Sequence, residues 1–207
     1  MRNCRILGVD NSTKSTGWSV IDVVDGKLKL IDYGCIERHG MDVQEVLVNY
    51  EHVLNDVLRQ FKPDYIAAEQ MFVSINRLTA MRLAQVHGVM LLTAKKVNVP
   101  VVYYSVMTLK SKVLGGIKAK NDDGSKKTGA QMKLEVQAKV VDMLGRHLFI
   151  KEYNDDVTDS MSAAITFFLM DGLEVEKKPK KKAKAKTEKV DKPKVKSKVS
   201  KSKVKDK

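Results

Sequence analysis

Four acidic residues occupy positions in this sequence from which they could bind metal ions together. Asp10 follows the apolar run RILGV, and Glu69 closes a second apolar run, YIAA. If these runs are neighbouring parallel strands, their carboxyl ends lie at one edge of the sheet, where ligands gather in open α/β proteins. Asp156 and Asp159 stand three residues apart in a helical pattern and share one helix face. We therefore expect the four carboxylates to meet.

Such a cluster has a definite chemistry. Four crowded carboxylates repel one another and raise one another's pKa unless a cation neutralises them. Oxygen ligands without His or Cys select Mg²⁺ or Mn²⁺ over zinc. Two such ions a few Å apart support in-line attack on a phosphodiester, because one activates water and the other stabilises the leaving 3′ oxygen. The acids therefore predict a two-metal hydrolase of phosphodiesters.

Each acid also has an ordinary structural interpretation. Asp10 precedes an Asn-Ser pair and fits a turn residue. Asp155 and Asp156 fit an N-cap and a first-turn acid, which the helix dipole favours. Glu69 is harder to explain in this way, because an acid that closes an apolar run has no apolar partner. The coincidence of all four acids favours the metal site over these separate explanations.

The elements that must position the acids alternate between strand and helix patterns. Asp25-Gly26, between two strand-like runs, is a strong hairpin signal. Strands are predicted over residues 5–9, 17–24, 27–37, 65–68 and 101–104. Helices are predicted over residues 42–61, 76–97, 106–114, 130–144 and 155–170. A hairpin followed by helix–strand alternation predicts an α/β fold, a mixed five-stranded sheet with helices on both sides.

The charge of the chain is concentrated at one end. The formal net charge is +13 over 207 residues, and residues 177–207 hold 16 of the 38 basic and 3 of the 25 acidic side chains. Residues 1–176 are therefore neutral, and their length predicts one domain. Residues 177–207 contain no aromatic residue and no aliphatic residue larger than Val, so we expect a disordered basic tail.

Several classes of protein are excluded by composition. Two cysteines in apolar contexts argue against a disulfide framework or a zinc site. The apolar stretches are far shorter than the roughly 18–20 residues that span a bilayer, and the first ten residues do not resemble a signal peptide. We therefore expect a soluble intracellular protein without a membrane partner.

Three motifs together resemble a known family. ILGVDNSTKSTGWSVID, PDYIAAEQMF and DDVTDSMSAAI are similar, in order and spacing, to the RuvC-type Holliday junction resolvases of bacteria and their phages. The resemblance spans about residues 4–170 and is most specific over residues 63–88. It implies an RNase H-like fold and a crossover junction endodeoxyribonuclease that makes paired symmetric nicks in four-way junctions. It also implies two Mg²⁺ ions per subunit, held by Asp10, Glu69, Asp156 and Asp159.

The resemblance extends to residues that contact DNA. Phe72 follows the glutamate by three positions, where family members place an aromatic ring that stacks at the junction centre; a core Phe is the alternative. Lys110 and Lys133 resemble the lysines that support catalysis and contact phosphate. The loop before Lys133 is longer than the bacterial pattern, so Lys126 or Lys127 is an alternative to it.

This loop, over residues 115–128, is expected to be polar, mobile and basic. Its four lysines are candidate DNA contacts, and the alternative for each is a solvated surface charge: Lys118, Lys120, Lys126 and Lys127.

The same resemblance implies a homodimer that packs through the helix over residues 76–97. Interface candidates on that helix, with ordinary core as the alternative, are Met81, Leu83, Val86 and Met90.

The tail departs from the bacterial pattern. Sixteen lysines can contact many phosphates without reading sequence, and the alternative is a solubility tail. The segment KKPKKKAKAK also resembles a nuclear-import signal. The expected location is the cytoplasm of a bacterial or phage-infected cell, or the nucleus or viral factory of a eukaryotic host.

Three other functions are compatible with parts of the sequence. A broader branched-DNA nuclease would cut forks, flaps and three-way junctions as readily as four-way ones. An actin-like or sugar-kinase ATPase is suggested by GVDNSTKSTGWSV, which is similar to a phosphate loop, but the chain is about half the length of such two-lobed enzymes. A non-catalytic DNA-binding protein would act without metal.

Overall fold

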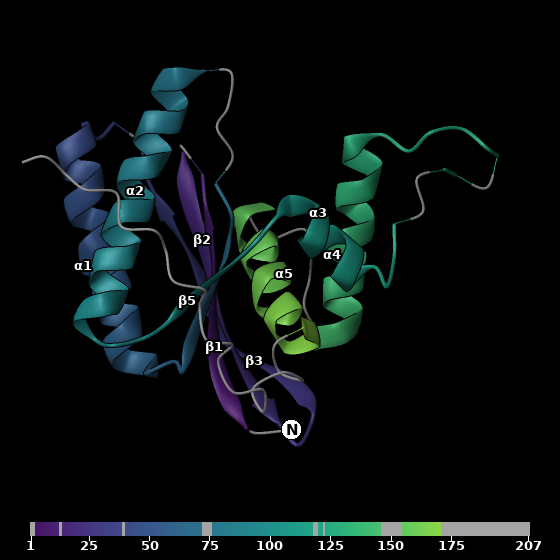
Figure 1. Cartoon of the computed structure of the whole chain (residues 1–207), viewed down its shortest axis with the longest axis horizontal. Helices are drawn as coiled ribbons and strands as arrows, with labels where there is room; N and C mark the ends of the chain where they lie inside the picture. The colour runs from purple at the N-terminus through teal and green to yellow at the C-terminus, as the bar shows by residue number, and fades with distance from the viewer. Residues whose placement is uncertain are drawn as a thin grey trace, which may run out of the picture. The chain divides into compact units, whose positions relative to one another are not determined.

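The computed structural model describes residues 3–12, 14–38, 40–71, 76–117, 120–121, 123–145 and 155–170 (Figure 1). All of these belong to one unit of the chain, Met1–Glu176. Phe72, Lys118 and the predicted tail over residues 177–207 lie outside the described residues. The domain boundary before Lys177 stays a prediction.

A mixed sheet of five strands organises the fold. Its order is β3-β2-β1-β4-β5, with β1 antiparallel to β2 and parallel to β4. The hairpin turn that joins β2 to β3 has positive φ at Asp25 and Gly26, as its sequence predicts. This sheet confirms the predicted fold class. Its strands are β1 (Cys4–Asn11), β2 (Ser15–Val24), β3 (Lys27–Glu37), β4 (Tyr65–Glu69) and β5 (Val101–Tyr104).

Helices cover both faces of the sheet. One face carries α1 (Val43–Phe61) and α2 (Arg77–Lys96), and the other carries α3 (Val106–Val113), α4 (Gly129–Leu144) and α5 (Asp155–Met170) (Figure 1). Polar side chains cap four of them, since Asp42, Asn76, Ser105 and Thr128 each accept a backbone N–H bond at a helix start. No described helix is long and apolar enough to cross a membrane.

The alternation of side chains along the strands divides the core into two clusters. Leu7 and Val9 of β1 pack with α1 and α2, whereas Ile6 of the same strand packs with α5. In β4, Ala68 faces the first cluster and Ala67 the second. Because successive residues of a strand face opposite sides, Asp10 and Glu69 lie on the α5 side of the sheet.

Helix α5 approaches the sheet at two glycines. A Cβ added to Gly8 would lie 2.0 Å from the carbonyl oxygen of Ser160, and one added to Gly17 would lie 1.9 Å from that of Asp156. Gly17 is also the residue opposite Asp10 in the β1–β2 ladder. The backbone of α5 therefore lies against the strand that pairs with Asp10, with no room for a side chain between them.

We expect Gly17→Ala to lower the free energy of unfolding by about 1–3 kcal/mol, because the added methyl group must displace the first turn of α5. Urea denaturation measures this loss. Gly129→Ala, at the first residue of α4, is the matched control, since nothing lies within 4 Å of the same methyl group there. A Gly17→Ala protein as stable as the control would contradict the close packing of α5.

Candidate active site

The carboxyl ends of β1 and β4 place two of the predicted acids side by side. The last pair of the parallel β1–β4 ladder is Val9 with Ala68, so Asp10 and Glu69 are the next residue of each strand. Asp159 approaches from α5, and the three acids line one cleft of about 420 Å³. The sequence-based expectation that strand ends and a helix face converge is therefore met by these three acids.

Two predicted lysines line the same cleft. Lys110 comes from α3 and Lys133 from α4. Lys127, which the sequence left as an alternative to Lys133, pairs instead with Glu135 and lines a separate pocket between α4 and the segment that follows α3. The structure thus brings Lys133, and not Lys127, to the acids.

The cleft is a poor environment for unneutralised carboxylates. Burial raises the pKa of Asp10 from 3.8 to about 8, with further contributions from the charges of Asp159, Glu69 and Asp156. Burial and neighbouring acids also raise the pKa of Glu69 and of Asp159. A cation in the cleft would lower the pKa of each of these acids, because it would stabilise the ionised carboxylate.

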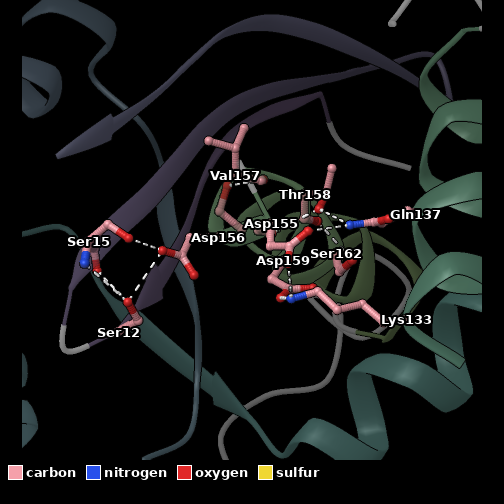
Figure 2. Close-up of polar contacts among 11 residues, drawn as sticks. Ser12, Ser15, Lys133, Gln137, Asp155, Asp156, Val157, Thr158, Asp159 and Ser162 are labelled. Atoms are coloured by element: carbon pink, nitrogen blue, oxygen red, sulfur yellow. Dashed lines mark hydrogen bonds and ion pairs between the residues drawn. The ribbon is translucent and has the colours of Figure 1, made fainter. Parts of the chain in front are cut away.

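Lys133 supplies part of the missing positive charge. Its Nζ lies 3.1 Å from Asp155 Oδ2 and 3.2 Å from Asp159 Oδ2 (Figure 2). Burial acts to lower the pKa of Lys133, but the two carboxylates outweigh it and the pKa is raised. The hydrogen bond from Lys133 in turn lowers the pKa of Asp155, which also accepts a 2.9 Å bond from Gln137 Nε2.

The fourth predicted acid, Asp156, has different neighbours. Its Oδ2 accepts hydrogen bonds from Ser12 Oγ, at 3.3 Å, and from Ser15 Oγ. Figure 2 shows Asp156 pointing toward these serines, while Asp159 points toward Lys133. Asp156 is not among the residues that line the cleft, although its charge acts on Asp10 and Asp159.

The donor set suits a hard divalent cation. Within the described ranges, no three His, Cys, Asp or Glu side chains are grouped closely enough to hold a metal ion as they stand. The buried acids nevertheless offer only carboxylate oxygens, and burial together with the charges of neighbouring acids raises their pKa values. The metal-binding roles of Asp10, Glu69, Asp156 and Asp159 stay predictions.

Sequence reasoning missed several polar residues around the acids. Asp155 was interpreted only as a helix-start residue, yet it shares Lys133 with Asp159. Ser12 was interpreted only as part of a turn, and Ser15 was given no role, because they lie 144 and 141 positions from Asp156 in the chain. No local pattern marks them.

The basic loop contains an ordered turn among its described residues. Lys120 and Lys126 form an antiparallel bridge, and Asn121 N donates to Ser125 O. Asp123 Oδ1 accepts bonds from the backbone and the hydroxyl of Ser125. Lys120 and Lys126 are therefore neighbours across a small hairpin. Their role in DNA binding, like that of Lys118, stays a prediction.

The interface candidates on α2 separate into two groups. Val86 and Met90 are buried in the core with α1, so their proposed place in an interface is wrong. Leu83 lines the acidic cleft, and Met81 is 61% exposed. A periodic apolar pattern could not distinguish these faces, because α2 carries apolar residues on more than one of them.

A five-stranded mixed sheet with acids at the ends of β1 and β4 and on α5 defines an RNase H-like fold of the resolvase type. The sequence model of one family, described as crossover junction endodeoxyribonuclease RuvC, matches residues 6–167. The chain belongs to this family.

Individual relatives agree with this assignment. The RuvC protein of Syntrophomonas wolfei is 31% identical over 162 residues, covering 78% of this chain and 86% of the relative. That of Shewanella sp. (strain ANA-3) is 32% identical over 142 residues, covering 68% and 82%. Among solved structures, T. thermophilus RuvC in complex with a Holliday junction substrate superposes with a TM-score of 0.67 at 20% identity, covering 82% of this chain and 96% of that one.

The pKa of Asp10 predicts a dependence of stability on pH. The native state holds this proton more tightly than the unfolded chain, so the contribution of Asp10 to stability falls as the pH rises from about 4 to about 8. In chelator, Asp10→Asn should raise the melting temperature at pH 8 by about 3 °C or more, and the gain should vanish near pH 4. Asp56→Asn, at an exposed site on α1, is the control; equal shifts in both variants would contradict the prediction.

Proposed function

We propose that this protein is a Mg²⁺-dependent endonuclease that resolves four-way DNA junctions by paired symmetric nicks. One observation carries the proposal: in a chain of the RuvC family, Asp10, Glu69 and Asp159 line one cleft together with Lys110 and Lys133. The broader class, a crossover junction endodeoxyribonuclease, follows from family membership. The metal and the paired cuts are the proposed part.

Asp10, Glu69, Asp156 and Asp159 would hold two Mg²⁺ ions, with Mn²⁺ as a substitute. When bound, the ions would activate a water molecule and stabilise the leaving 3′ oxygen of the scissile phosphodiester. The acids would orient that chemistry on the rigid frame of β1, β4 and α5. Lys133, which pairs with Asp159 in the structure, would contact the scissile phosphate when Asp159 serves as a metal ligand.

The lysines divide by their surroundings. Lys110 lies near the charge of Glu69 and would stabilise negative charge that develops on the phosphate. Lys120 and Lys126 would hold backbone phosphates. Two like charges opposite each other across a β-bridge repel each other, and an anion bound between them removes this repulsion. Lys127 is mostly buried against Glu135 and would anchor this hairpin to α4.

The remaining DNA contacts are proposed from the sequence. Phe72 would stack at the centre of the junction, and Lys118 would join the other lysines of the loop. The basic segment over residues 177–207 would add affinity that falls as salt rises. We also propose that the protein works where its DNA is, in the cytoplasm of a bacterial or phage-infected cell or in the nucleus or viral factory of a eukaryotic host.

Asp10→Asn should abolish cleavage, by at least about 1,000-fold, while junction binding is kept, because the variant loses a metal ligand but no phosphate contact. A labelled synthetic four-way junction, incubated with Mg²⁺ or with chelator, reports cutting, and a gel-shift assay in chelator reports binding. Native protein should give paired nicks that vanish in chelator.

Asp56→Asn is the matched control and should cut like the native protein. Cleavage by Asp10→Asn would refute the metal assignment. Equal cutting of flaps, forks and three-way junctions would indicate a broader branched-DNA nuclease. Metal-independent binding without any cutting would indicate a non-catalytic DNA-binding protein, and ATP turnover without DNA cleavage would indicate the ATPase.

The paired cuts would require two subunits, and α2 offers a surface for them. An apolar stripe on its exposed side includes Leu78, Met81 and Leu92, at 57%, 61% and 58% exposure. Gly88 lies on the same stripe by helical spacing, with nothing within 4 Å of an added Cβ. A glycine there would let a second copy of α2 approach closely, so we propose that the homodimer packs on this stripe.

Met81→Glu should convert the dimer into monomers, because it places a charge within the apolar stripe. Sedimentation velocity measures the change, and junction cleavage should shift from paired to single nicks. Val48→Glu on α1, where the native side chain is 70% exposed, is the control and should stay dimeric. A dimeric Met81→Glu protein would place the interface elsewhere.

A further inference from the structure

The carboxylate of Asp156 accepts hydrogen bonds from two serine hydroxyl groups beside the β1–β2 turn. Ser12 Oγ and Ser15 Oγ both donate to Oδ2, and they come from the two sides of the β1–β2 turn. Ser12 Oγ also accepts bonds from the backbone N–H groups of Lys14 and Ser15, and its single hydrogen is shared between Asp156 Oδ2, at 3.3 Å, and the carbonyl oxygen of Ser15, at 3.0 Å. The same hydroxyl group that contacts Asp156 thus also holds the two sides of the turn together.

The same turn is fixed from the opposite face of the sheet by a buried arginine. Arg38, at the end of β3, is only 9% exposed. Its Nη1 donates to the carbonyl oxygen of Ser12 and its Nη2 to Thr16 Oγ1. Its guanidinium lies 5.8 Å from the centre of the Tyr50 ring on α1.

A continuous set of contacts therefore joins α1 to α5. It runs from Tyr50 through Arg38 to the turn, and from the turn through Ser12 and Ser15 to Asp156. Gly17, three residues after Lys14 in the same hairpin, meets the backbone of Asp156 directly. The β1–β2 hairpin thus contacts both the backbone and the carboxylate of Asp156.

Hydroxyl donors and lysine hold a carboxylate with different consequences for a metal. Lys133 neutralises Asp155 and Asp159 with a full positive charge, which an incoming cation must displace. A serine hydroxyl orients a carboxylate and leaves its negative charge available to a cation. Carboxylates that ligate metals are themselves hydrogen-bonded, and losing such a partner costs about 10–100-fold in metal affinity.

We infer that Ser12 and Ser15 are positioning residues that orient Asp156 for a divalent cation, and that Arg38 fixes the turn that carries them. This inference rests on the proposed metal-dependent function and goes beyond the four acids, because it assigns a role to residues that act through Asp156.

The test measures metal binding without DNA. Isothermal titration of the full chain with Mn²⁺ gives the dissociation constant, and circular dichroism confirms folding. Ser15→Ala should weaken Mn²⁺ binding by about 10-fold. Ser15→Thr keeps the hydroxyl and should restore most of the affinity. Arg38→Lys keeps the charge but loses the two-pronged donor, so it should weaken binding by a smaller factor.

Ser19→Ala is the matched control. Ser19 lies on the same strand and face as Ser15, is fully buried, and its hydroxyl has no hydrogen-bond partner in the described part of the chain. Its removal should leave Mn²⁺ affinity unchanged. Ser15→Ala binding within twofold of the native protein, or an equal loss in Ser19→Ala, would overturn the serine role alone. A native chain that binds no Mn²⁺ would overturn the proposed metal function as well.

Discussion

The contact between α5 and the β1–β2 hairpin is the constraint on which the candidate site depends. At Gly8 and Gly17 the helix backbone lies so close to the sheet that no Cβ fits between them. Small residues on α5 complete this contact, including Ser160, Ala163 and Ala164, all fully buried. The result is that acids from the start of a helix near the end of the chain lie beside Asp10, near its beginning.

This close packing has an electrostatic cost. Asp10, Glu69 and Asp159 share a partly apolar cleft, and burial there is the largest cause of the raised pKa of each. Lys133 forms an ion pair with Asp159, which acts to lower the pKa of this acid, yet the pKa values of all three acids stay raised. Buried acids with raised pKa values are more typical of functional sites than of groups that stabilise a fold. Residues 1–176 have zero net charge, so their composition does not reveal this cluster of buried acids.

Much of the fold was predictable because its signals are local. The hairpin turn at Asp25-Gly26, the helices and the apolar strands each follow from a few neighbouring residues, and all are present. The convergence of Asp10 with Glu69 was also predictable, since parallel strands end at one edge of a sheet. The faces of α2 were not, because its apolar residues serve the core, the cleft and the surface at once.

The sequence by itself determined the order of the elements, the types of the reactive residues and their membership in one family, because these depend on local pattern and on motif spacing. Only the tertiary structure decided which neighbours each acid has. Asp155 and Asp156 are adjacent in the chain and look alike, yet one is paired with Lys133 and the other with Ser12 and Ser15. The physical reason is that successive residues of a helix point about 100° apart, so each meets a different packed element.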